Sequence, residues 1–136
     1  MNAGALELAQ RTASSAGPFA ASLAADCSQI ALAMRAGAIG DALDAFDSTA
    51  SRLGRFLTFV VVASELLGHG APTLGAVLGD YGRRVLACLD RVQHALDRGD
   101  LVGLTLALEH GLGPTLGEYC GYAEQVERGL DLRMAA

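Results

Sequence analysis

The segment from Phe56 to Leu67 constrains the fold most, because it is apolar on almost every side of a helix. It reads Phe-Leu-Thr-Phe-Val-Val-Val-Ala-Ser-Glu-Leu-Leu. A helix of this kind has to be covered by the rest of its own chain or by another chain. The segment contains Glu65 and is shorter than the ~20 residues that a membrane-spanning helix needs, so no membrane span is predicted.

Apolar residues recur at spacings of three and four along most of the 136 residues, and no stretch alternates with a period of two. This pattern predicts an all-α chain, residues 1–136 forming a single domain. The expected fold is an antiparallel up-down four-helix bundle with a short extra N-terminal helical segment. The four predicted helices cover Pro18 to Arg35, Ile39 to Leu67, Pro72 to Arg98 and Leu101 to Leu130.

Local signals indicate where these helices begin, end and bend. Gly37 and Gly99 suit the left-handed position after a helix, and Asp100 is a suitable N-cap for the fourth helix. Residues 1–16 are expected to form a frayed lead-in helix that Gly17-Pro18 interrupts. Pro114 lies inside the fourth helical pattern, so we expect a kink there, eased by Gly111 and Gly113.

Composition excludes several classes of function. The net charge is −5 and no basic patch is visible, which argues against nucleic acid as a partner. The three cysteines are far apart and form no Cys-x-x-Cys pair, which favours a reducing compartment. With no charged and apolar leader at the start of the sequence, the expected location is the cytoplasm.

Catalytic and metal-binding signatures are also missing from the sequence. Cys27, Cys88 and Cys120 fall on or beside the predicted core stripes, where a cysteine is usually inert. Glu65 and His69 are spaced like two metal ligands, but no further pair accompanies them. Glu109 and His110 are adjacent, so their side chains are expected to diverge. We therefore predict a protein that is not an enzyme and binds no metal or cofactor.

Two rows of glycine mark a candidate binding surface. If the chain reverses at residues 99–100, Gly82 of the third helix faces Gly117 of the fourth. One interpretation is that the two backbones approach closely there. The other is a shallow groove, edged by Tyr81, Tyr119 and Tyr122, that receives a partner helix.

The apolar segment is the second candidate surface. Each helix of a four-helix bundle normally keeps one edge in solvent, so some of its large side chains would be exposed in a monomer. The residues concerned are Phe56, Phe59, Val62 and Leu66. Either the chain's own helices cover them, or they bind a second copy or the amphipathic helix of a client protein.

Two parts of the sequence resemble known helical proteins. The first part resembles the later helices of bacterial flagellin export chaperones, and it contains Leu78-Gly79-Asp80-Tyr81, Arg84-Val85-Leu86 and the run from Ala95 to Asp100. The resemblance implies a small acidic helical bundle that holds the helical C-terminal part of flagellin. The early tyrosine-containing segment of those chaperones is absent from this sequence.

The run from Leu106 to Leu116 is similar to a motif of uncharacterised bacterial helical proteins, Leu-Glu-Tyr-Glu-Leu-x-Pro-x-Leu, with His110 and Gly111 in place of Tyr and Glu. The function expected from these features is that of a non-enzymatic, chaperone-like or adaptor protein that holds an amphipathic helix. The alternatives are a structural homodimer or oligomer without a client, and a metal or small-molecule site in the bundle core.

Overall fold

The structure, a computed structural model, describes residues 3–135, and all regular structure in that range is helical. Three long helices come first: α1 (Ala3–Arg35), α2 (Ile39–Gly68) and α3 (Pro72–Asp97). An interrupted rod follows, made of α4 (Leu101–Leu106), the π-helical η1 (Ala107–Leu112), α5 (Gly113–Gly117), the 3₁₀-helical η2 (Glu118–Gly121) and α6 (Ala123–Ala135). The predicted all-α class is confirmed.

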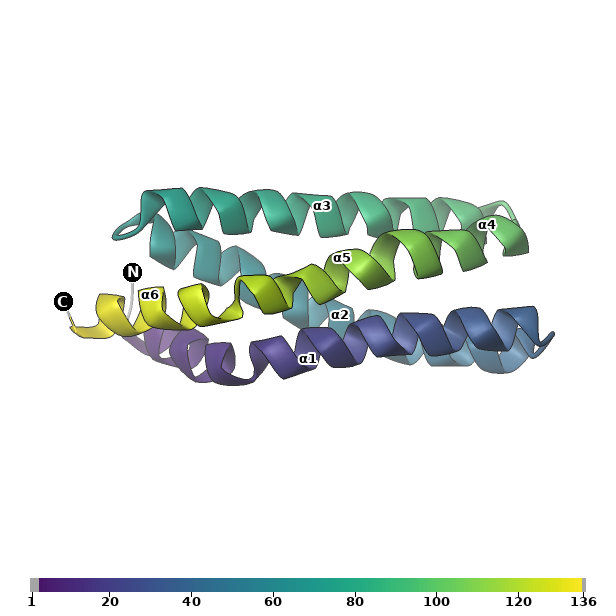
Figure 1. Ribbon diagram of the computed structural model, residues 1–136, viewed down its shortest axis with the longest axis horizontal. Coiled ribbons are helices and arrows are strands. Elements are labelled where there is room, and N and C mark those ends of the chain that lie inside the picture. Colours follow the sequence, from purple (N-terminus) through teal and green to yellow (C-terminus); the bar gives the residue numbers. More distant parts are fainter. Residues whose placement is uncertain (1–2, 136) are drawn as a thin grey trace.

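The three long helices and the interrupted rod lie side by side (Figure 1). Short turns join them, so that each reverses the direction of the one before. α1 packs against α2, and α2 packs against α3. The interrupted rod contacts α3 through α4 and η1, and it contacts α1 through η1, α5 and α6.

The predicted helix ends are confirmed at both tight turns. Gly37 and Gly99 have φ angles of 83° and 65°, in the left-handed region that glycine adopts without strain. The carboxylate of Asp100 accepts a hydrogen bond of 2.9 Å from the amide of Gly103, as an N-cap does. These ends depend on local backbone geometry, which explains why the sequence predicts them well.

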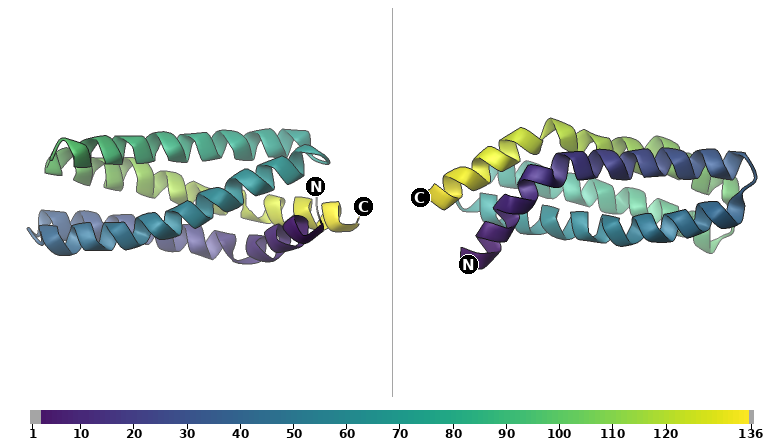
Figure 2. Two further views of the ribbon diagram at one scale, coloured as in Figure 1. Left: turned by 180° about the vertical axis from the view of Figure 1, so that it is seen from behind. Right: turned by 90° about the horizontal axis from the view of Figure 1, so that it is seen from below.

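The prediction of a separate lead-in helix is wrong, because α1 continues through Pro18. Proline at this position has no amide proton to donate to the carbonyl of Ser14, and its ring bends the helix. Figure 2 (right) shows the first part of α1 turning away from the later part. The helix persists because one of its faces is buried on both sides of the bend, at Ala9, Ala13, Ala16 and Ala20.

The interrupted rod departs from α-helical geometry around Pro114. In η1 the amide of Gly113 donates to the carbonyl of Leu108, five residues back, and α5 with Pro114 in its first turn follows directly. After α5 the helix tightens into η2 before α6 begins. The departure from α-helical geometry is therefore spread over both sides of the proline.

Gly75 and Gly79 of α3 provide a test of the packing between α2 and α3. A Cβ atom at Gly75 would lie 2.9 Å from the backbone oxygen of Ser64, whereas one at Gly79 would meet only the end of Arg83 at 3.9 Å. We expect Gly75→Ala to lower the free energy of unfolding by ~1–3 kcal/mol, since the backbones must separate. Gly79→Ala should raise it by ~0.5–1 kcal/mol through helix propensity.

Urea denaturation followed by circular dichroism measures both variants. Equal stability of Gly75→Ala and Gly79→Ala would contradict the close approach of α2 and α3.

Candidate functional site

The structure buries most of the residues that the sequence nominates for partner binding. Phe56, Phe59, Leu66, Tyr81, Gly82 and Tyr119 are buried by other helices of the same chain. Val62, Gly117 and Tyr122 are half-buried. The apolar segment is thus largely covered from within, and only its outer edge, which includes Val61 at 50% exposure, faces solvent.

An aromatic cluster occupies the middle of the molecule. The ring of Phe56 lies 5.2 Å from Tyr119 and 6.5 Å from Tyr81, in edge-to-face arrangements, and 6.4 Å from Phe19. Phe59 and Tyr122 extend the cluster at its two sides. All the aromatic residues of the chain except Phe46 belong to it. The cluster therefore joins α1, α2, α3 and the interrupted rod at one level.

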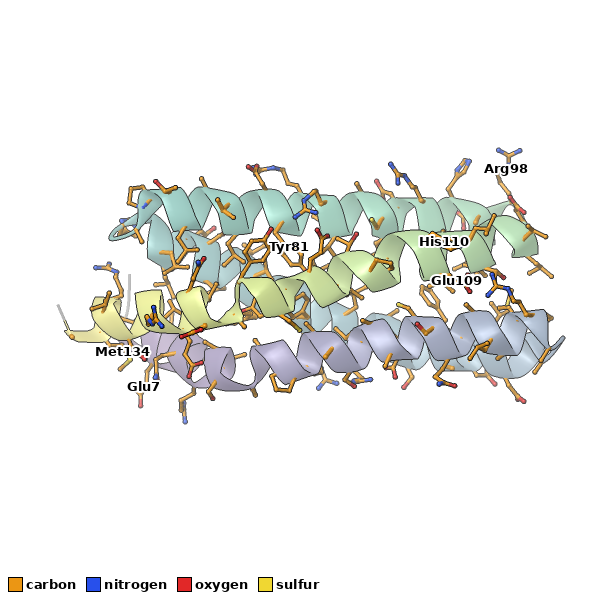
Figure 3. All side chains as sticks on the ribbon, in the orientation of Figure 1. Glu7, Tyr81, Arg98, Glu109, His110 and Met134 are labelled. Atoms are coloured by element: carbon orange, nitrogen blue, oxygen red, sulfur yellow. The ribbon has the colours of Figure 1, made fainter. Side chains whose placement is uncertain are left out.

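The two buried tyrosines of this cluster have different hydrogen bonding. The hydroxyl of Tyr81 lies 2.8 Å from the carbonyl oxygen of Thr115 and 3.1 Å from that of Leu116, and donates its proton to this pair (Figure 3). The hydroxyl of Tyr119 is buried without a partner among residues 3–135. Burial raises the pKa of both phenols above the usual range, with Glu118 adding to it at Tyr81 and Glu127 at Tyr119.

The glycine rows do not form an open groove, and Gly82 does not pack on Gly117. A Cβ atom at Gly82 would lie 3.1 Å from Val60 of α2, and one at Gly117 would lie 3.9 Å from Ala24 of α1. Each row therefore allows a close approach to a different neighbouring helix. The sequence leaves two interpretations open, an open groove and a close approach of the two glycine rows. The structure shows a close approach, but of Gly82 to α2 and of Gly117 to α1.

A separate apolar groove lies between the first part of α1 and the outer edge of α2. This α1–α2 groove has a volume of about 370 Å³. Its walls are Ala5, Leu8, Ala9 and Thr12 of α1, and Arg55, Thr58, Phe59 and Val62 of α2. Phe59 and Val62 are the nominated residues that the groove brings together, and Leu8 at its rim is 59% exposed.

The polar groups of the α1–α2 groove are few. The hydroxyl of Thr12 donates to the carbonyl of Leu8, and that of Thr58 donates to the carbonyl of Gly54, each within its own helix. Arg55 has no carboxylate partner among residues 3–135. The groove thus offers an apolar surface with one available cation.

The sequence-based prediction does not include the α1 wall of this groove, because it expects residues 1–16 to be a frayed segment. A usable signal was present in the alanines, which recur at spacings of four and three from Ala9 to Ala20. Alanine contributes little hydrophobic surface, so this stripe carries less weight than one of leucine. It nevertheless buries one face of α1 on both sides of Pro18.

The histidines and acidic residues assemble no metal site in the described part of the chain. The expected divergence of Glu109 and His110 is wrong, since the ring of His110 lies 3.2 Å from the Glu109 carboxylate. Glu109 also forms an ion pair with Arg35 of α1 (Figure 3). Both residues lie in the π-helical η1, and the ion pair between Glu109 and Arg35 joins the interrupted rod to α1.

No protein-family model, curated protein or solved structure matches this chain. Within residues 3–135, no helix has both the length and the apolar character to cross a membrane.

The different hydrogen bonding of Tyr81 and Tyr119 leads to a prediction about stability. Tyr81→Phe should lower the free energy of unfolding by ~1–2 kcal/mol, because two buried carbonyls lose a donor. Tyr119→Phe removes an oxygen that has no partner among the described residues, so we expect no loss of stability, or a gain of up to ~1 kcal/mol. Thermal and urea unfolding measure both variants. A larger loss for Tyr119→Phe than for Tyr81→Phe would contradict this hydrogen bonding.

Cysteine reactivity gives a second prediction. Burial, with a further effect of Asp26, raises the pKa of the Cys27 thiol to about 12, and Cys88 is also buried, whereas Cys120 is exposed. Iodoacetamide at pH 8 should therefore modify Cys120 in the folded protein and leave Cys27 and Cys88 intact until urea is added. Peptide mass spectrometry reads the sites. Modification of native Cys27 at the rate of Cys120 would contradict the packing of α1.

Proposed function

We propose that this chain is a non-enzymatic, protein-binding, antiparallel up-down four-helix bundle that acts as a chaperone-like or adaptor module. The observation that carries the proposal is the α1–α2 groove, with Phe59 at 7% and Val62 at partial exposure on one wall and Leu8 on the other. An apolar groove between two helices is a common docking place for the apolar face of a third helix.

The chemistry of the groove favours a helix over an extended peptide. An extended peptide needs donors and acceptors along its whole backbone, and the polar side chains that line the groove are only Thr12, Arg55 and Thr58. A helix satisfies its own backbone and presents only side chains. The partner class is therefore an amphipathic helix whose apolar side chains fill the groove.

The resemblance of residues 78–100 to flagellin export chaperones agrees with this partner class, and we extend the proposal to a cytoplasmic role of that kind. A structural homodimer is the second candidate. Val61 and Leu8 are half or more exposed beside the groove, and association would remove both from water.

Crosslinking tests whether a helix occupies the groove. A photoreactive residue in place of the exposed Thr58 should yield a discrete crosslinked polypeptide in the native host, with the attachment inside a helical segment. Leu8→Glu in the same protein should abolish that product, because a carboxylate at the rim disfavours an apolar occupant.

Leu32→Glu is the matched control, since Leu32 is also an exposed leucine of α1, at 56%, and is not part of the groove. Both variants should keep the melting temperature of the parent. Equal crosslinking in the Leu8→Glu and Leu32→Glu proteins would contradict binding in the groove.

A further inference from the structure

The α2 wall of the groove carries a pattern that is complementary to itself. Arg55, Thr58, Val62 and Glu65 follow one another at spacings of three, four and three, which places them along one stripe of the helix. The stripe has a cation at one end, an anion at the other and the groove residues Thr58 and Val62 between them. Arg55 and Glu65 stand five residues on either side of Val60.

Both charged ends of the stripe are available. Arg55 and Glu65 are exposed, and neither has an ion-pair partner within residues 3–135. By contrast, Arg52, one turn before Arg55, is held by Asp26 and lies over the ring of Phe19. The charges of the stripe therefore play no part in holding the chain's own helices together.

Two copies of this stripe fit together in an antiparallel arrangement. With a two-fold axis at the level of Val60, Arg55 of one copy lies opposite Glu65 of the other, and Thr58 lies opposite Val62. Each contact occurs twice, as in any two-fold symmetric interface. In antiparallel coiled coils, the two core positions of the seven-residue repeat pair with each other across the interface in the same way.

The same arrangement covers the exposed apolar side chains. Val61 is 50% exposed and flanks the stripe one residue from the level of the axis, so the other copy would cover it there. Leu8, at the rim of the groove and 59% exposed, would be covered on the opposite flank of the stripe, the flank of Phe59. An interface of this form removes apolar area from water at the place where the segment Phe56–Leu67 remains uncovered.

We propose that the helix received by the α1–α2 groove is α2 of a second copy of this chain, packed antiparallel with Arg55 paired to Glu65. The inference rests on the proposed function and names the partner of the same groove. A client helix and the second copy compete for one surface, so self-association keeps the groove covered until a client displaces it.

Charge reversal tests the pairing by sedimentation equilibrium at micromolar concentrations. The parent chain should be a dimer. Arg55→Glu and Glu65→Arg should each raise the dissociation constant by about tenfold or more at low salt, since each replaces two opposite-charge contacts with two like-charge contacts. The double variant carrying both changes should return to the parent value.

An equimolar mixture of Arg55→Glu and Glu65→Arg should form a heterodimer as stable as the parent dimer, because both contacts are then opposite in charge. Arg91→Glu is the control. Arg91 is an exposed arginine of α3, also without an ion pair in residues 3–135, and its reversal should leave the dissociation constant unchanged.

Three outcomes overturn the proposal: a folded parent chain that stays monomeric, single reversals that behave as Arg91→Glu does, or a mixture that fails to recover dimerisation. A monomeric chain whose Thr58 crosslinks to a different polypeptide overturns the self-pairing and leaves helix binding in place. A monomeric chain with no crosslink at Thr58 overturns both.

Discussion

The packing of Phe56 against Tyr119 and Tyr81 is the interaction on which the rest of the structure depends. These rings come from α2, the interrupted rod and α3, and Phe19 adds α1 to the same level. The chain has few aromatic residues, and their concentration at one level gives the packed helices a common centre. The hydroxyl of Tyr81 then donates to carbonyls of Thr115 and Leu116, next to the point where the rod leaves α-helical geometry.

Around this centre, small residues determine how closely the helices approach. Gly75 and Gly82 bring α3 against α2, Gly113 lies against Cys27, and the alanine face of α1 lies close to its neighbours. α1 bends at Pro18 (Figure 2). On the N-terminal side of this bend, residues of α1 and α2 form the two walls of the α1–α2 groove.

The groove connects the fold to the proposed activity. Interior packing covers Phe56, Phe59 and Leu66, and it leaves Val61 and part of Val62 at an edge whose ends carry Arg55 and Glu65. An apolar edge between opposite charges suits an antiparallel helix. A second copy of α2 supplies such a helix with matching spacing. Under these proposals, holding a client and forming a dimer would be two uses of one surface, and changes to its charges would separate them.

The sequence by itself determined the helical class, the turns at Gly37 and Gly99 and the cap at Asp100, because these depend on apolar periodicity and on backbone preferences within a few residues. It also singled out Phe59 and Val62, two of the residues that line the groove. Only the tertiary structure decided that α1 continues through Pro18, that Gly82 meets Val60 and not Gly117, and that His110 turns back to Glu109. The first two outcomes depend on contacts with segments far away in the chain. The third occurs in the π-helical turn before Pro114, where the sequence predicts a distortion of the helix but not its form. The tertiary structure also decided which side of Phe56–Leu67 stays uncovered, because that side depends on where α1, α3 and α6 pack on α2.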